Sequence, residues 1–278
     1  GRQAERFTAA LGDADMLAIV IACFGDLDSD GKPVDPVRAL DEVILELVVA
    51  DHGVVERRLE RVEKDIKKGL KDAATEKDVL QRCLPVLEAE QPLSTLGLSA
   101  DELKELRSFQ LLTLKPLLVL ANVPEDQAAA PPPAALLEYA TGKGLKTVAF
   151  CAQLEAEIAG LDPEEGEAFL ADYAITESAA PRVIRGCYET LDLISFLTAG
   201  GPDEVRAWTI ARGTRAQNAA GAIHSDIERG FIRAETVAYD DFAAHGSFEA
   251  CRKAGVLRLE GKDYIVQDGD IITFRFNV

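Results

Sequence analysis

The sequence predicts a mixed α/β protein in which a parallel sheet carries an inserted antiparallel helical hairpin and is followed by a β-grasp module. Three apolar runs, at 17–23, 117–121 and 147–150, are typical of buried parallel strands. The long stretch between the first two runs repeats apolar residues at three- and four-residue steps, as an amphipathic helix does. Beyond residue 188, short alternating segments are separated by turn residues.

The first strand is followed by one long amphipathic helix, which Gly53 weakens without ending. Its apolar positions are Leu40, Val43, Ile44, Leu47, Val55, Leu59, Val62, Ile66 and Leu70. A return helix is expected at 79–87. Ser99 and Glu102 form a capping box for a further helix that is expected to run to Leu112. The result is an antiparallel helical hairpin inserted between two strands.

The C-terminal region alternates strands with short helices. A strand at 204–210 ends before Gly213, and Thr214 with Gln217 predicts a capping box for a helix that reaches residue 223. The remaining predictions are strands at 231–239, 256–259, 264–266 and 271–276 and a helix at 248–254 that ends at Gly255. Strands that wrap a helix in so short a span predict a β-grasp fold.

Composition sets limits on the class of protein. A chain of 278 residues with 47% hydrophobic residues predicts two domains. Its five cysteines are odd in number and lack C-x-x-C spacing, so they indicate neither a disulfide framework nor a zinc site, and they favour a reducing cytoplasm. The longest apolar run, at 16–24, is well short of the roughly 18 to 20 residues of a membrane helix.

The net charge of −18 argues against a protein that coats nucleic acid nonspecifically. The charge is unevenly distributed, because residues from 188 onward contain 10 Lys and Arg against 14 Asp and Glu. The C-terminal module is therefore expected to be the RNA-facing part.

The C-terminal sequence resembles that of a known family. The runs EVRAWTIARGTRAQNAAGAIHSDIERGFIRAETVAYDDF at 204–242 and LEGKDYIVQDGDIITFRFNV at 259–278 closely resemble the TGS domain that ends the YchF or Obg-like ATPase family. The resemblance implies a P-loop nucleotide-binding domain, of which this chain has part of the sheet, with an inserted helical arm. The expected division is a partial nucleotide-binding domain at 1–35 and 114–187, a helical hairpin domain at 36–113 and a TGS domain at 188–278.

The resemblance also implies a base-binding site after the second and third strands. Asn122, Val123 and Glu125 stand where GTPases have Asn-Lys-x-Asp, and Cys151, Ala152 and Gln153 align with the Ser-Ala-Lys loop behind the base. The usual Asp accepts hydrogen bonds from guanine N1 and N2, where adenine has no donor, so Glu125 and Val123 weaken guanine selection. Taken without the family, N-x-x-E after a strand is typical of a polar exit that caps a helix.

No G-x-x-x-x-G-K-[ST] segment for phosphate binding occurs in the sequence. The segment at 25–32 only imitates one, because its glycines are wrongly spaced and Pro33 stands where Ser or Thr must be. Since the family has this segment before the region that matches residue 2 onward, the chain is expected to begin just downstream of it. We therefore name no catalytic residue, and we expect the present chain alone to be inactive.

For the complete protein, the resemblance implies ATP, with GTP weaker, together with magnesium, and none of these is expected to bind tightly to the present chain alone. It also implies association with ribosomes or translation factors in the cytoplasm. The alternative is a noncatalytic paralogue or fragment that acts as an adaptor and binds a ribosome, RNA or another protein.

Two basic sets are candidate contacts for RNA or a partner. Arg57, Arg61, Lys64 and Lys68 align on one face of the long helix, and Arg212, Arg215, Arg229 and Arg233 lie in the C-terminal module. The alternative for the helix is a solvated face with i,i+4 ion pairs. For the module, Trp208 could stack on RNA but occupies a strand position typical of core.

Two further motifs, an acidic loop and a histidine, favour structural roles over functional ones. Asp26 to Gly31 imitates an EF-hand start, but Val37 occupies the position of the required Glu and a strand precedes the loop, which indicates a solvated acidic turn. His224 has no readable triad partner, so it is expected to be a hydrogen-bonded histidine at a helix end. No metal-ligand set is apparent.

Overall fold

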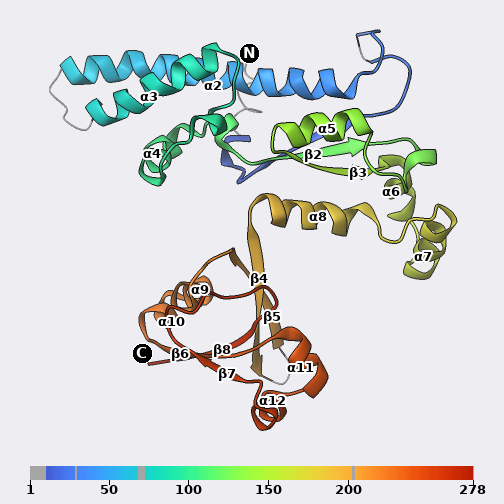
Figure 1. Cartoon of the computed structure of the whole chain (residues 1–278), viewed down its shortest axis with the longest axis vertical. Helices are drawn as coiled ribbons and strands as arrows, with labels where there is room; N and C mark the ends of the chain where they lie inside the picture. The colour runs from blue at the N-terminus through green and yellow to red at the C-terminus, as the bar shows by residue number, and fades with distance from the viewer. Residues whose placement is uncertain (1–10, 29, 68–72, 202–203, 278) are drawn as a thin grey trace. The chain divides into compact units, whose positions relative to one another are not determined.

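The computed structural model describes residues 11–28, 30–67, 73–201 and 204–277. The chain divides into two compact units, Gly1–Thr190 and Leu191–Val278. The first unit carries a three-stranded sheet and a long helical arm, and the second carries a five-stranded sheet (Figure 1).

The sheet of the first unit contains all three predicted strands. They are β1 (Leu17–Ala22), β2 (Leu117–Asn122) and β3 (Lys146–Phe150). The strands are parallel in the order β1-β2-β3, so the carboxyl ends of all three meet at one edge. The central strand β2 is buried on both faces, but β1 alternates and leaves Val20 58% exposed. The prediction of a fully buried first strand was therefore wrong for one of its faces.

Helices cover both faces of this sheet. The covering helices are α2 (Pro36–Lys67), α5 (Ala134–Gly142) and α8 (Ala179–Thr190). After β3, α6 (Ala152–Ile158) and α7 (Pro163–Asp172) pack together through Leu154 and Phe169. On one face, Ile21 packs with Leu40 of α2 and Leu136 of α5. On the other face, α8 approaches β3 so closely at Gly186 that an added Cβ would lie 3.1 Å from Val148 Cγ2. Three layers result, with α5 and α8 on opposite sides of β2 and β3 (Figure 1).

The inserted arm is the predicted antiparallel hairpin. α2 continues through Gly53, and α3 (Ala73–Glu88) returns beside it. Its core contains Val55, Val62, Leu80 and Cys83, each fully buried or nearly so. Lys68 and Leu70 lie outside the residues that the structure describes.

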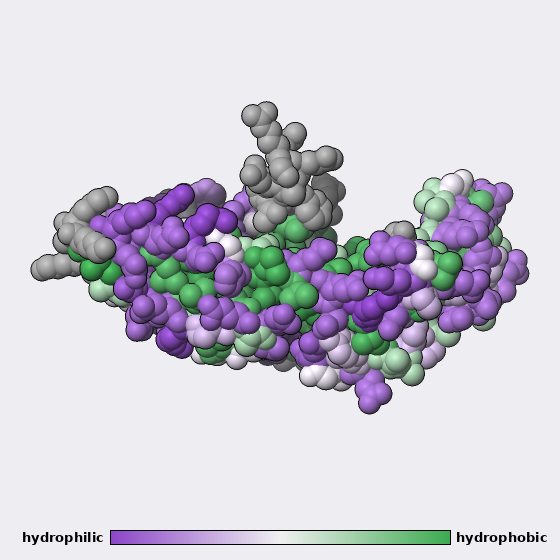
Figure 2. All heavy atoms as spheres, turned by 90° about the horizontal axis from the view of Figure 1, so that it is seen from above, coloured by the Kyte–Doolittle hydropathy of each residue, from purple (hydrophilic) through white to green (hydrophobic). Residues whose placement is uncertain are grey.

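Hydrophobic residues also gather over the middle of α2 on the face shown in Figure 2, between hydrophilic ones. Leu45 and Val49 of α2 are exposed, and neither belongs to the predicted apolar stripe. The periodic pattern therefore left out these two exposed residues, but it also missed Val48, which is 1% exposed.

The segment after the hairpin departs from its prediction. It consists of η1 (Leu93–Leu96), α4 (Ala100–Leu106), η2 (Arg107–Phe109) and η3 (Leu112–Leu114). The capping box of Ser99 and Glu102 is confirmed, but the expected helix to Leu112 was wrong, because α4 ends at Leu106. The buried carboxylate of Asp51 accepts the N–H groups of Leu112 and Thr113, at 2.8 Å each, and these bonds replace a helical ladder.

The second unit is a β-grasp fold. Its elements are β4 (Leu193–Gly201), β5 (Glu204–Ala211), α9 (Ala216–Ile223), α10 (Ser225–Arg229), β6 (Phe231–Val237), α11 (Tyr239–His245), α12 (Phe248–Ala254), β7 (Arg258–Glu260) and β8 (Ile271–Phe276). The sheet order is β5-β4-β8-β6-β7, with β4 and β8 parallel and the other neighbours antiparallel. This order, with α9 packed on one face, is that of ubiquitin-like folds. Its core includes Ile194, Phe196, Ala219 and Ile272.

Two local predictions in this unit were wrong for one reason. Thr214 and Gln217 form no capping box, since the N-cap of α9 is Arg215, whose side chain makes no capping hydrogen bond to the helix start. The 264–266 segment makes only an isolated bridge through Ile265. Its backbone instead faces the helix start, where Ala216 N–H donates to the Tyr264 carbonyl at 2.8 Å. Backbone partners distant in sequence thus replace both the cap and the strand.

Candidate functional site

A pocket of about 490 Å³ lies at the carboxyl ends of the three parallel strands. Its lining residues are Phe24, Asn122, Val123, Pro124, Glu125, Asp126, Cys151, Ala152 and Gln153. All six residues that the sequence indicated for a base site are among them. Parallel α/β sheets bind ligands at this edge, and the volume lies within the range of small-molecule sites.

Hydrogen bonds join the two segments of the pocket. Asn122 ends β2, and its side-chain Oδ1 accepts the N–H of Ala152 at 3.0 Å, where α6 begins. Val123 N–H donates to the Phe150 carbonyl at 2.8 Å, which extends the β2–β3 ladder by one bond. Asn122 therefore has a structural role that fixes the spacing of the two loops. It also satisfies one of the free N–H groups at the helix start.

Glu125 opens a short turn, η4 (Glu125–Gln127), on the pocket wall. Gln127 and Ala128 donate their N–H groups to Pro124 and Glu125 carbonyls, so this turn uses backbone bonds and leaves the Glu125 carboxylate available. Glu125 is half-buried. Burial, and after it the Glu125 carboxylate, raise the pKa of Tyr173.

Sequence reasoning missed Phe24 as a pocket residue. Its side chain is 48% exposed although it is aromatic, and it borders the pocket directly after β1. Its position at the carboxyl end of a parallel strand was the available signal. Beside it, burial raises the pKa of Cys23 to about 11, so this thiol stays protonated at neutral pH. Cys151 is buried and caps α6 without a side-chain hydrogen bond.

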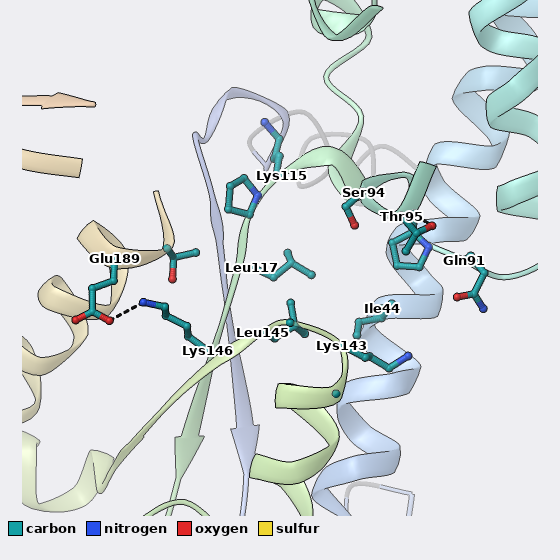
Figure 3. Close-up of a pocket in the computed structure, with 15 residues that line it drawn as sticks. Ile44, Gln91, Ser94, Thr95, Lys115, Leu117, Lys143, Leu145, Lys146 and Glu189 are labelled. Carbon is teal, nitrogen blue, oxygen red and sulfur yellow. Dashed lines mark hydrogen bonds and ion pairs between the residues drawn. The ribbon is translucent and has the colours of Figure 1, made fainter. Parts of the chain in front are cut away.

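A larger pocket, of about 590 Å³, lies at the opposite, amino edge of the sheet (Figure 3). Ile44, Leu117 and Leu145 form apolar parts of its wall. Its lysines already have partners: Lys146 pairs with Glu189 at 2.7 Å, and Lys115 Nζ donates to two backbone carbonyls. Since the amino edge is not where such sheets bind ligands, the smaller pocket is the better candidate.

The sequence of the chain is similar to those of known proteins. Residues 193–277 match the family described as YchF-GTPase_C, protein of unknown function (DUF933). The chain is 42% identical over 281 residues to a Bacillus subtilis protein named "Ribosome-binding ATPase YchF", covering 99% of this chain and 76% of that protein. A Haemophilus influenzae protein of the same name is 43% identical over 277 residues, with the same coverage. The chain belongs to the YchF family.

Solved structures agree with membership of the YchF family. The structure of the Schizosaccharomyces pombe YchF GTPase matches with a TM-score of 0.81 and 29% identity, covering 97% of this chain and 74% of that one. A GTP binding protein from Pyrococcus horikoshii matches with a TM-score of 0.64 at 20% identity, and this likeness concerns the fold alone.

The basic stripe of this YchF-family arm is exposed. Arg57, Arg61 and Lys64 all lie on the solvent side of α2, and Lys68 lies outside the described residues. Within the described part of the arm, none of the three forms an ion pair. Glu63 pairs across the hairpin with Lys77 at 3.0 Å. The stripe therefore stays a candidate contact surface.

The four candidate arginines of the second unit differ in their partners. Arg212 pairs with Asp192 and Arg215 with Asp263, at 2.9 Å each. Arg229 pairs with Asp226 three residues earlier.

Arg233 instead shares the buried carboxylate of Glu235 with two other arginines. Trp208, on β5, is half-buried against the core and donates to Thr198 Oγ1 at 2.9 Å, in agreement with its expected core position.

His224 and the acidic turn at Asp26 to Gly31 have the structural roles that the sequence indicated. His224 caps α10, and its Nδ1 accepts the N–H of Asp226 at 3.1 Å. Asp28 accepts the N–H groups of Asp30 and Lys32 and pairs with Arg38, so the acidic turn is occupied by its own chain.

No group of three or more His, Cys, Asp or Glu side chains in the described ranges could hold a metal ion. Among the helices that the structure describes, none is long and apolar enough to cross a bilayer.

Proposed function

We propose that the complete YchF-family protein binds a purine nucleotide, ATP more tightly than GTP, in the pocket at the carboxyl edge of the parallel sheet. The observation that carries the proposal is the convergence of 122–126 and 151–153 around one pocket. In support, the bacterial relatives are named ribosome-binding ATPases. The whole protein would then hydrolyse ATP and associate with ribosomes in the cytoplasm.

Base selection depends on the carboxylate of Glu125. Guanine presents two N–H donors, at N1 and N2, to a carboxylate placed beside them, whereas adenine has an acceptor at N1 and no donor at C2. A Glu whose carboxylate is one methylene further from the backbone than that of Asp is displaced from this position. The loss of one hydrogen bond to a charged group removes most of the preference for guanine.

Phe24 would supply the apolar contact for the base. Its half-exposed ring borders the same pocket as the polar segments. Purines stack favourably on aromatic side chains whichever base they carry. Asn122, with its Oδ1 bonded to Ala152, would position the two loops rather than select the base.

Phosphate binding and hydrolysis require a glycine-rich loop with a lysine, and magnesium held by a loop hydroxyl. The pocket residues do not fit these two tasks, since they provide neither a lysine nor a Ser or Thr hydroxyl. We therefore assign to this pocket the recognition of the base and to none of its residues a catalytic step.

The proposal is tested by exchanging Glu125. Calorimetric titration of the protein with ATP and with GTP should give an affinity ratio that moves toward GTP by about tenfold in Glu125→Asp, the equivalent of about one charged hydrogen bond. Glu164→Asp, an exposed change on α7, is the matched control and should leave the ratio unchanged. An unchanged ratio in Glu125→Asp would remove the base-site assignment.

The alternative function is that of a noncatalytic adaptor that binds a ribosome, RNA or protein. The exposed arginine and lysine side chains of the arm, Arg57, Arg61 and Lys64, favour such a contact. Turnover of ATP by the protein would reject the purely noncatalytic alternative.

A further inference from the structure

Three arginines of the second unit converge on one buried carboxylate. Arg275 donates to both oxygens of Glu235, with Nε to Oε1 at 3.1 Å and Nη2 to Oε2 at 3.2 Å. Arg252 from α12 reaches Oε2 at 3.2 Å, and Arg233 lies 3.8 Å from Oε1. The Glu235 side chain is only 7% exposed, whereas each arginine side chain is about half exposed. The arginines therefore cover the carboxylate and face the solvent themselves.

The strand register places these charges on one face. Arg233 of β6 lies directly opposite Arg275 of β8, and Glu235 is two residues further along the same strand. The intervening residues, Ala234 and Phe274, point into the core on the other face. Like charges directly opposite each other weaken a sheet, so this pairing costs stability unless a second anion joins Glu235.

The charge balance distinguishes this cluster from the other arginines. Arg206, Arg212, Arg215 and Arg229 each have a carboxylate partner of their own. In the cluster, three guanidinium groups share one carboxylate, which leaves a local excess of two positive charges. Hydrogen bonds from Arg275 hold the pKa of Glu235 below its usual value, so the carboxylate stays ionised and the excess does not grow at neutral pH.

We propose that Arg233, Arg252 and Arg275 form a preorganised site for the phosphate backbone of RNA. Glu235 occupies one side of the guanidinium groups and fixes their orientation, and phosphate oxygens would bind the N–H groups that remain exposed. The planar guanidinium group suits bidentate contacts with phosphate, and three groups on one sheet face can follow successive phosphates. An acidic peptide is the less favoured ligand, because a nucleic-acid backbone repeats its charge regularly, as three guanidinium groups on one sheet face require, whereas the charges of a peptide depend on its side chains.

This inference rests on the proposed ribosome association and names the surface that would contribute to it. The test measures the affinity of the protein for a short fluorescein-labelled RNA hairpin by fluorescence anisotropy, between about 50 and 200 mM salt. Arg252→Gln and Lys253→Gln are matched variants, since they are adjacent on α12 and remove the same charge, but Lys253 pairs with Glu249 at 2.8 Å outside the cluster.

We expect Arg252→Gln and Arg233→Gln each to weaken binding several-fold and to lower the slope of log K against log salt by about one. Lys253→Gln should change neither quantity. Unaltered melting temperatures would establish that the variants remain folded. Equal effects of Arg252→Gln and Lys253→Gln would overturn the proposal, as would no RNA binding at low salt. Binding of polyglutamate but not RNA would overturn it in favour of an acidic partner.

Cosedimentation with purified ribosomal subunits separates this proposal from the function on which it rests. If the unaltered protein fails to cosediment while RNA binding depends on Arg233 and Arg252, the cluster is supported and the ribosome assignment fails. If cosedimentation occurs and both variants leave it and RNA binding unchanged, the cluster is overturned and the ribosome assignment remains.

Discussion

At the scale of single residues, sequence reasoning found the side chains whose role depends on where a strand ends. Asn122, Glu125 and Cys151 were identified by the resemblance to the family, since a position after an apolar run alone indicates only a polar strand exit, and the structure places all three around one pocket. Asp51 could not be found in this way, since its partner Leu112 is 61 residues away and only the folded arm brings them together.

The role of Asp51 can be measured by removing its carboxylate. Asp51 is 1% exposed and also accepts the Thr113 hydroxyl at 2.6 Å, and burial raises its pKa. Asp51→Ala would leave two backbone N–H groups without their acceptor. We expect a loss of about 2 to 4 kcal/mol in the free energy of unfolding, measured with urea.

The control for this variant is Glu46→Ala, which removes an exposed carboxylate from the same helix. It should change the free energy of unfolding by less than about 0.5 kcal/mol. Equal stabilities of Asp51→Ala and Glu46→Ala would mean that solvent replaces the carboxylate and that the end of α4 has another cause.

At the scale of helices and strands, periodicity was a good guide where one element packs along its length. It identified α2 through Gly53 and predicted β8 with its observed bounds, 271–276. Periodicity was a poor guide at the ends of elements. There, backbone N–H groups donate to residues distant in sequence: Ala216 donates to the Tyr264 carbonyl, and Leu112 donates to the Asp51 carboxylate. β4 was not predicted at all, although Asp192, which has a φ of 51° in the turn between α8 and β4, was an available turn signal.

The end of β8 gives a testable close contact. Asn277 N–H donates to the Gly230 carbonyl at 2.9 Å, and a Cβ at Gly230 would overlap the carbonyl oxygen of Asn277. We expect Gly230→Ala to lower the free energy of unfolding of the second unit by about 1 to 3 kcal/mol. Gly261→Ala is the control, because a Cβ there meets open space, and it should be neutral or stabilising by up to about 1 kcal/mol. If Gly230→Ala leaves the free energy of unfolding unchanged, Asn277 moves away from the added Cβ without loss of stability, and the prediction is wrong.

At the scale of the whole molecule, the sequence predicted a change of architecture near residue 188, and the contacts of the folded chain divide at Thr190 and Leu191. The expected separation of the first unit into a partial nucleotide-binding domain and a hairpin domain stays a prediction. Its sheet and arm share α2, which packs with Ile21 at one end and with Leu80 further along.

The second unit is expected to fold when residues 191–278 are expressed alone. Every residue of its core, from Ile194 to Phe274, belongs to the unit, so no buried apolar contact of that core is lost by separation. The single tryptophan, Trp208, is half-buried in this unit, and its fluorescence therefore reports on this unit in the whole chain as well.

The isolated unit and the whole chain should have the same urea midpoint by Trp208 fluorescence, with one cooperative transition in the isolated unit. Phe196→Ala serves as the control for a packed core, because Phe196 is fully buried and its truncation should cost about 3 to 5 kcal/mol. A gradual, noncooperative fluorescence change in residues 191–278 would mean that the rest of the chain is needed to order this core. In that case the β-grasp unit could not act as an independent surface for RNA.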